Sequence, residues 1–160
     1  KLTLSAFNLV KLIEDVFESE LMRARERNIK MEFAPGSEKN IMVWADRDRI
    51  VQVMSNLVVN ALKYGRENGR VVLDFLDMDD RVLVEVTDNG IGISPKDLPR
   101  IFERFYRVDK SRSRDMGGTG LGLAIVKHII EAHNQTITVR STVNEGTTFG
   151  FTLNKPVSNE

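Results

Sequence analysis

Four side chains that could bind a charged ligand recur on one face of a predicted helix near the middle of the chain. They are Asn56, Asn60, Lys63 and Tyr64, at positions i, i+4, i+7 and i+8. An apolar stripe with helical spacing lies beside them and consists of Val53, Met54, Leu57, Val58, Ala61 and Leu62. Amides, an ammonium and a phenol are costly on a packed face unless a ligand or water meets them. We therefore expect the polar face to meet a metal-bound triphosphate.

A second candidate segment follows a predicted strand, at residues 88–93. Asp88 closes the strand, and Gly90 and Gly92 come shortly after it. A carboxylate at the end of a sheet can accept a hydrogen bond from an exocyclic amine such as that of adenine, and glycines let a flat ring approach the backbone. Taken alone, the segment also fits an ordinary Asp-Asn-Gly turn.

Glycines cluster again at residues 117–122, before the last predicted helix. Glycines at a helix start expose backbone N–H groups and the positive end of the helix dipole, which together attract an anion. The run is not a Walker loop, because no Gly-Lys-Ser/Thr follows it. It is also a poor dinucleotide fingerprint, because a basic irregular segment rather than a strand precedes it. By itself the run fits an anion site and a flexible hinge equally well.

The connection between the two glycine segments, residues 94–115, is long for a compact domain, and such connections are usually functional or disordered. Phe102 and Phe105 could anchor it while its cations close over phosphates, which predicts a lid. For Lys110, Arg112 and Arg114 individually, a solvated charged loop is the better interpretation.

The elements that must position these residues can be predicted from periodicity. Helices are expected at about residues 9–21, 47–64 and 121–132, and strands near 29–33, 41–44, 71–75, 82–86, 137–139 and 149–153. They predict an α+β fold, a two-layer α/β sandwich in which a mixed, mostly antiparallel sheet of about five strands is covered on one face by three helices. Two histidines, His128 on the apolar side of the last helix and His133 near its C-terminus, are interpreted as structural.

The composition is that of a globular domain, with 160 residues of which 41% are hydrophobic and 29% charged. The net charge is zero, so no overall field attracts nucleic acid or anionic lipid, and no nucleic-acid partner is expected. The absence of cysteine excludes disulfides and cysteine-based metal sites, and no apolar run is long enough to span a bilayer. The chain does not begin with Met, which suggests a fragment of a longer protein.

Together and in this order, the segments resemble the catalytic, ATP-binding domain of bacterial sensor histidine kinases, which has the Bergerat fold. Residues 56–64 look like the N box, 88–92 like the first glycine box, 102–106 like the F box and 118–122 like the second glycine box, and 146–149 are similar to the closing Gly-Thr strand. The resemblance implies an ATP-binding domain at 7–155 with a lid at about 93–117. It also implies that a linker at 1–6 comes from a missing dimerisation and phosphoacceptor domain, and that 156–160 is a tail.

The resemblance implies ATP and Mg²⁺ as ligands. Asn56, Asn60, Lys63 and Arg107 would be the catalytic residues, with Asn60 coordinating Mg²⁺ and Arg107 reaching the terminal phosphates. The nucleotide would also contact Tyr64, Asp88, Gly90, Gly92, Ile93, Phe105, Gly118, Thr119, Gly120, Leu121, Gly122 and Thr147. In this set Asp88 would read the adenine amine, and Thr147 would hold a water beside it.

Asn56 indicates which kind of reaction the resemblance implies. Related ATP-hydrolysing families, the topoisomerase, mismatch-repair and heat-shock chaperone ATPases, carry Glu at this place as a general base, a role that Asn cannot fill. The sequence therefore favours transfer of the γ-phosphoryl group to a histidine on a separate helical-hairpin domain, in two-component signalling. The alternatives are an ATPase or serine kinase of the same fold and a non-catalytic nucleotide-sensing module.

The resemblance also implies partners and a location. They are the phosphoacceptor domain of the same protein and, through the full-length kinase, a response regulator. The isolated domain would be a monomer, whereas the full-length protein would be a homodimer. The domain would be cytoplasmic, in a sensor that could be membrane-anchored.

Overall fold

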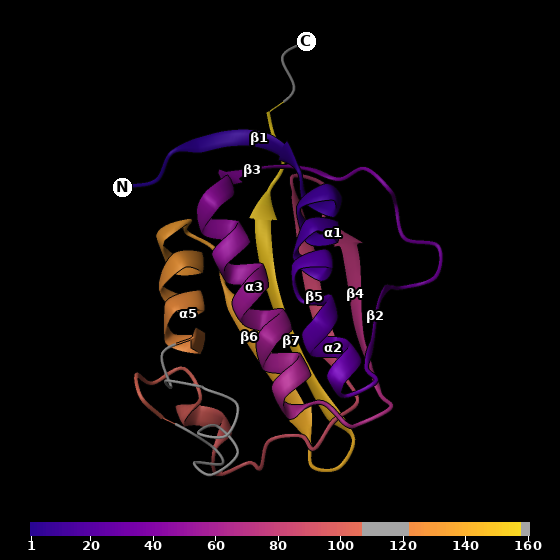
Figure 1. Cartoon of the computed structure of the whole chain (residues 1–160). Helices are drawn as coiled ribbons and strands as arrows, with labels where there is room; N and C mark the ends of the chain where they lie inside the picture. Colours follow the sequence, from indigo (N-terminus) through magenta and orange to yellow (C-terminus); the bar gives the residue numbers. More distant parts are fainter. Residues whose placement is uncertain (107–121, 158–160) are drawn as a thin grey trace.

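The computed structural model describes residues 1–106 and 122–157 as two layers, a sheet and a set of helices on one of its faces (Figure 1). In these residues the sheet has seven strands, β1 (Leu4–Asn8), β2 (Lys30–Phe33), β3 (Met42–Asp46), β4 (Arg70–Asp77), β5 (Arg81–Asp88), β6 (Ile137–Thr142) and β7 (Gly146–Asn154). Their order is β1-β3-β7-β5-β4-β2, and β6 pairs with β7 beside that path. β2 runs parallel to β4, and the other pairs are antiparallel.

The same part of the chain forms four α-helices and one short 3-10 helix. They are α1 (Leu9–Ser19), α2 (Leu21–Glu26), α3 (Arg47–Tyr64), α5 (Gly122–Ala132) and η1 (Leu98–Arg100). Figure 1 shows α3 along the middle of the sheet, between α1 and α5. Its start is set by Asp46, whose side chain accepts a hydrogen bond from the Arg49 N–H. None of the helices in the described ranges is long and apolar enough to cross a membrane.

The core lies between the sheet and the helices and fixes the place of α3. The inward sides of the central strands are buried and consist of Val71, Leu73, Val82, Val84, Val86, Phe149, Phe151 and Leu153. They pack against the buried stripes of α1, α3 and α5 in one cluster. The C-terminal end of α3 meets the segment after β5, where the Ile91 N–H donates to the Tyr64 carbonyl over 3.2 Å. The core therefore brings two of the predicted site segments together.

The predicted sandwich is confirmed, but the described part of the sheet has seven strands, one more than the six predicted segments and more than the total of about five. β1 was not predicted, because Leu4 and Ala6 lie on the exposed side of the strand and its register is set by a distant partner. It pairs with β3 from Leu4 opposite Asp46 to Asn8 opposite Met42. Residues 4–6, predicted as part of a linker, thus belong to the sheet.

Two details of the predicted helices are corrected. The first helix is divided at Glu20, whose φ of −103° and ψ of 8° end α1 before α2 begins. In α5 the buried face consists of Val126, Ile129 and Ile130, so His128 is exposed rather than on the apolar side. Residues 123–126, 129 and 130 are all apolar, and periodicity could not decide which of these faces meets α3.

Candidate functional site

The two predicted faces of α3 are present. The six apolar residues of the stripe are between 0% and 3% exposed, and they anchor the helix in the core. The polar residues Asn56, Asn60, Lys63 and Tyr64 are each half-buried along the other side. The Lys63 ammonium lies 5.5 Å from the centre of the Tyr64 ring, within the range of a cation–π interaction. The helix thus presents amide, ammonium and phenol groups at the edge of the core, as the sequence predicted.

Asp88 is the last residue of β5 and is only 4% exposed. Burial raises the pKa of its carboxyl to about 6, although hydrogen bonds from the backbone of Gly90 and Thr147 act in the opposite direction. The Gly90 N–H donates to Oδ1 over 2.9 Å. A buried carboxyl whose charged form is penalised in this way can be stabilised further by an additional hydrogen-bond donor. Such a group is suited to binding an amine.

The glycines after Asp88 allow backbone to pack against backbone. A Cβ on Gly90 would lie 2.1 Å from the Tyr64 carbonyl oxygen, and a Cβ on Gly92 would lie 2.2 Å from that of Thr142. Gly92 also has a φ of +73°, which favours glycine. In this structure the space beside these glycines is occupied by the end of α3 and by β6, so they have a structural role besides any contact with a ligand.

Three side chains form a row across three strands at this end of the sheet. Asp88 on β5 is opposite Thr147 on β7, and Thr147 is opposite Ser141 on β6. The Ser141 and Thr147 hydroxyls are 2.8 Å apart, and the Ile93 N–H donates to Ser141 Oγ over 2.7 Å. The structure thus brings the predicted residues Asp88, Ile93 and Thr147 together. Ser141 was missed, because only the register between β6 and β7 places it beside Thr147.

Arg66, which was also missed, ties the segment after Asp88 to its surroundings. Its Nε donates to the Asn89 carbonyl over 3.2 Å, and its Nη2 donates to the Asn144 carbonyl over 2.8 Å. The Asn144 N–H in turn donates to the Ile91 carbonyl over 2.8 Å. These bonds link the end of α3 to the turn between β6 and β7.

The start of α5 lies beside the N box. Gly122 is its first residue, and its carbonyl accepts a hydrogen bond from Asn56 Nδ2 over 3.4 Å. The predicted residues Arg107, Gly118, Thr119, Gly120 and Leu121 lie outside the described ranges. Of the second glycine box, the structure therefore describes Gly122 alone.

The F box has one half-buried ring that packs against the core and one exposed ring. Phe102 packs edge-on against Phe149 of β7, with 6.1 Å between ring centres, and the Lys127 ammonium lies 5.8 Å from the Phe102 ring. Phe105 is 65% exposed and has a φ of 67°. The predicted anchor pair is thus wrong for Phe105, because spacing in a loop does not specify which aromatic ring reaches the core.

A polar cluster supports the segment before the F box. The Asp97 carboxylate accepts from the Tyr106 hydroxyl and, over 2.8 Å, from Ser94 Oγ. The Tyr106 hydrogen bond, followed by that of Ser94, lowers the pKa of Asp97. The Arg100 guanidinium lies 4.4 Å from the centre of the Tyr106 ring. These contacts join the two ends of residues 94–106 to each other through Asp97.

The structural interpretation of His133 agrees with its contacts. The Asp46 N–H donates to Nε2 over 3.0 Å, and Nδ1 lies 2.8 Å from the Ile129 carbonyl. A backbone N–H can only donate and a carbonyl can only accept, so the proton of this imidazole is on Nδ1. His133 thus connects the end of α5 to the start of α3.

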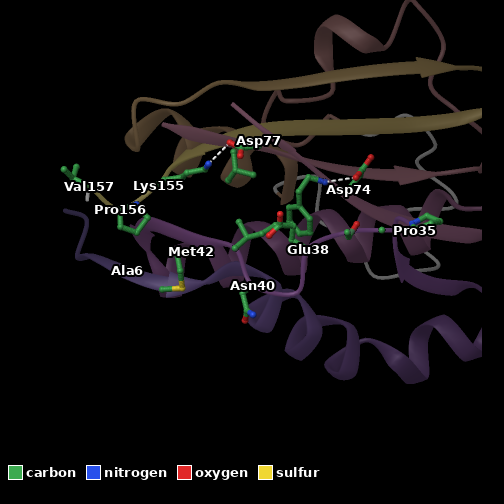
Figure 2. A pocket seen from close by; sticks show the side chains of 15 residues that line it. Ala6, Pro35, Glu38, Asn40, Met42, Asp74, Asp77, Lys155, Pro156 and Val157 are labelled. Atoms are coloured by element: carbon green, nitrogen blue, oxygen red, sulfur yellow. Dashed lines mark hydrogen bonds and ion pairs between the residues drawn. The ribbon is translucent and has the colours of Figure 1, made fainter. Parts of the chain in front are cut away.

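A groove of about 770 Å³ lies at the other end of the β4–β5 hairpin (Figure 2). It runs between the segment 35–42 and the Asp77 end of β4, where Lys155 forms an ion pair with Asp77 over 2.5 Å. Val82, which also lines it, is separated from Asp88 by most of the length of β5, roughly 20 Å at ~3.3 Å per residue. The groove contains none of the predicted site residues.

The donor set fits a nucleotide with Mg²⁺. Mg²⁺ prefers oxygen ligands, keeps several waters, and is commonly held by few protein groups together with substrate phosphates. The half-buried amide of Asn60 offers one such oxygen, and Lys63 adds a positive charge nearby. Within the described ranges no group of three or more His, Asp and Glu residues could hold a metal by itself.

Comparison with known proteins gives consistent matches. Residues 45–157 match the family described as histidine kinase-, DNA gyrase B-, and HSP90-like ATPase. The chain is 46% identical over 118 residues to sensor histidine kinase WalK of Bacillus subtilis (strain 168), which is 72% of this chain and 19% of that protein. This chain thus spans about a fifth of the length of that relative.

Solved structures of similar proteins cover nearly the whole chain. The catalytic domain of histidine kinase ThkA has a TM-score of 0.83 and 34% identity, over 96% of this chain and 97% of that one. ThkA in complex with the response regulator protein TrrA has a TM-score of 0.78 and 32% identity, over 96% of this chain and 42% of that one. Full-length ShkA in complex with AMPPNP has a TM-score of 0.83 and 31% identity, over 99% of this chain and 33% of that one.

Proposed function

Because the chain belongs to the histidine kinase-, DNA gyrase B-, and HSP90-like ATPase family, and within it resembles histidine kinase catalytic domains, we propose that it binds Mg-ATP and transfers the γ-phosphoryl group to a histidine of a separate domain. The transfer would serve two-component signalling. The relative that is 46% identical to this chain is named a sensor histidine kinase.

The observation that carries the proposal is the buried carboxyl of Asp88 at the end of β5, beside the polar face of α3. Burial raises its pKa to about 6, so an ionised Asp88 gains from an added donor such as the exocyclic amine of adenine. The Ile91 N–H bond to Tyr64 joins this nucleobase side to the helix that would hold the phosphates. The binding of AMPPNP, an analogue of ATP, by ShkA supports the choice of ligand.

The phosphate side would be formed by α3. Asn60 would hold Mg²⁺ through its amide oxygen, Lys63 would neutralise phosphate charge, and Tyr64 would border the nucleoside. When bound, Mg²⁺ neutralises the charge that develops on the phosphates during transfer. Such a reaction depends on positioning and charge stabilisation, which a rigid helix face provides. The contacts of Arg107 and of residues 118–121 with phosphates stay predictions.

Asn56 supports transfer over hydrolysis. Its side chain amide donates to the Gly122 carbonyl over 3.4 Å, which occupies the amide in a bond between α3 and α5. An amide cannot take a proton from water at neutral pH, so this position supplies no general base.

The proposed partners follow from the same function. The acceptor would be the histidine of a helical dimerisation domain, and a response regulator would receive the phosphoryl group from the full-length kinase. The complex of ThkA with TrrA supports the second partner. We propose that the isolated domain is a monomer, that the full-length protein is a homodimer, and that this domain is cytoplasmic.

The test is to incubate the chain with labelled Mg-ATP and a separately produced helical-hairpin phosphoacceptor domain. We expect label on the acceptor that is stable in base and labile in acid, the signature of phosphohistidine. The same mixture with an acceptor whose histidine is replaced by alanine is the control. Rapid release of free phosphate without labelled acceptor would instead establish an ATPase, and tight binding without either product would establish a nucleotide sensor.

A further inference from the structure

The row formed by Asp88, Thr147 and Ser141 contains a residue that none of the predicted contacts uses. Ser141 is half-buried at the end of β6 and makes three hydrogen-bond contacts. They join its Oγ to the Ile93 N–H over 2.7 Å, to the Gly146 carbonyl over 2.9 Å and to Thr147 Oγ1 over 2.8 Å. From these contacts and the proposed nucleotide site, we propose that Ser141 is a positioning residue that sets the nucleobase specificity of the pocket through Thr147.

The direction of each of these hydrogen bonds follows from which of the groups carry a proton. A serine hydroxyl has one proton and two lone pairs. The Ile93 N–H can only donate, so it uses one lone pair of Ser141, and the Gly146 carbonyl can only accept, so it takes the serine proton. One lone pair remains for the contact with Thr147. Thr147 therefore donates its single proton to Ser141.

This arrangement leaves Thr147 Oγ1 with lone pairs only. Thr147 also donates its backbone N–H to the Asp88 carboxyl, so hydroxyl and carboxylate are held next to each other. An ionised carboxylate has no proton to donate either. The two groups at this end of the sheet thus both accept hydrogen bonds.

A pair of acceptors selects among purines. The six-amino group of adenine carries two N–H donors, which this pair can accept directly or through a water. Hypoxanthine and guanine have a carbonyl at that position, which would face two acceptors without a proton between them. Ser141 thus contributes to selection by keeping the threonine hydroxyl from turning to donate.

The test uses Ser141→Ala, with ADP and IDP titrated calorimetrically in the presence of Mg²⁺. IDP differs from ADP at the purine ring only in carrying the carbonyl and a ring N–H. We expect wild type to prefer ADP and the variant to lose about three- to tenfold of that preference, the effect of roughly one hydrogen bond, because Thr147 can then donate to the carbonyl. Ser141→Thr keeps a hydroxyl and should restore the preference.

Two further variants separate specificity from general stability. Thr147→Val removes the hydroxyl that Ser141 orients, so adding Ser141→Ala to it should not change the ADP-to-IDP ratio further. Ser19→Ala removes a hydroxyl that donates to the Val16 carbonyl on α1, and it should leave the ratio at the wild-type value. Thermal melting checks that each variant is folded.

The outcomes distinguish this inference from the proposed function. Wild type that binds neither nucleotide overturns both. Wild type that prefers ADP, with Ser141→Ala showing an unchanged ratio, overturns the role of Ser141 alone. If Ser141→Ala does not fold, a Ser141→Thr variant with an altered ratio, or a Thr147→Val variant with the wild-type ratio, likewise overturns it.

Discussion

Replacing Asp88 with asparagine removes a negative charge from a buried position and keeps an oxygen that can accept from the Gly90 N–H. The pKa of about 6 in the folded protein lies above the 3.8 of a free aspartate, because burial disfavours the charged form. Above pH 6 the folded protein therefore carries a charge whose burial opposes folding. The variant lacks this charge.

The two pKa values set the size of the effect. A difference of about two pKa units corresponds to about 3 kcal/mol of unfolding free energy at 1.36 kcal/mol per unit. The asparagine amide must also be desolvated, so we expect Asp88→Asn to raise the unfolding free energy at pH 7 by about 1 to 3 kcal/mol. The gain should be absent below pH 4, grow as the pH rises from about 4 to 6, and stay constant above that range.

Nucleotide binding should change in the opposite direction. The variant loses the charged acceptor for the adenine amine, which should weaken ADP binding by ~1–3 kcal/mol, or about 5- to 150-fold. Wild-type affinity for ADP should fall as the pH decreases below about 6, because Asp88 becomes protonated, whereas the affinity of the variant should not.

Urea unfolding between pH 4 and 8 and calorimetric titration with ADP measure both effects. A variant that is less stable than wild type at pH 7 would contradict the cost of burying this charge. Equal ADP affinity in the two proteins would show that the carboxylate does not contact the nucleobase.

Five other substitutions test the metal assignment and the packing around the site. Asn60→Ala should abolish Mg²⁺-dependent phosphoryl transfer yet change the unfolding free energy by less than about 1 kcal/mol, and an unaltered transfer rate would disprove the metal assignment. Phe102→Ala should destabilise the domain by roughly 2 kcal/mol in urea unfolding and Phe105→Ala by less than about 0.5, because only the Phe102 ring packs against the core. Equal losses would contradict this packing. Gly92→Ala should lower the unfolding free energy by more than about 2 kcal/mol, because its Cβ would lie 2.2 Å from the Thr142 carbonyl oxygen. Gly36→Ala has a similar φ of +79° but open space around it, so it should lower the unfolding free energy by only about 1 kcal/mol. Similar unfolding midpoints for the two variants would refute the close packing at Gly92.

The parts of the fold that could be predicted from sequence are those with local signals. The two faces of α3 follow from helical spacing, and the strands β4 and β5 follow from the alternation of apolar and polar residues. β1 carries no such signal, because its exposed residues include Leu4 and its pairing depends on β3.

In the candidate site, too, some residues could be predicted from local signals and others could not. Asp88 and Thr147 could be found by their places at strand ends, and the structure puts them opposite each other. Ser141 could not be singled out, because a serine at the end of a strand becomes informative only through the register that places it beside Thr147. Phe105 was misplaced for a related reason, since backbone geometry in a loop, here a φ of 67°, determines where a side chain points.

The close packing of the segment after Asp88 also bears on the rate and the entropy of binding. Its backbone is hydrogen-bonded to Tyr64, Asn144 and Ser141, and a Cβ at Gly92 would have no room. Ordering a free loop on binding would cost about 1–2 kcal/mol per residue at 25 °C, and here that ordering is completed during folding. The nucleobase thus meets a preorganised surface, so its association should require little rearrangement and its dissociation rate should carry most differences in affinity among variants.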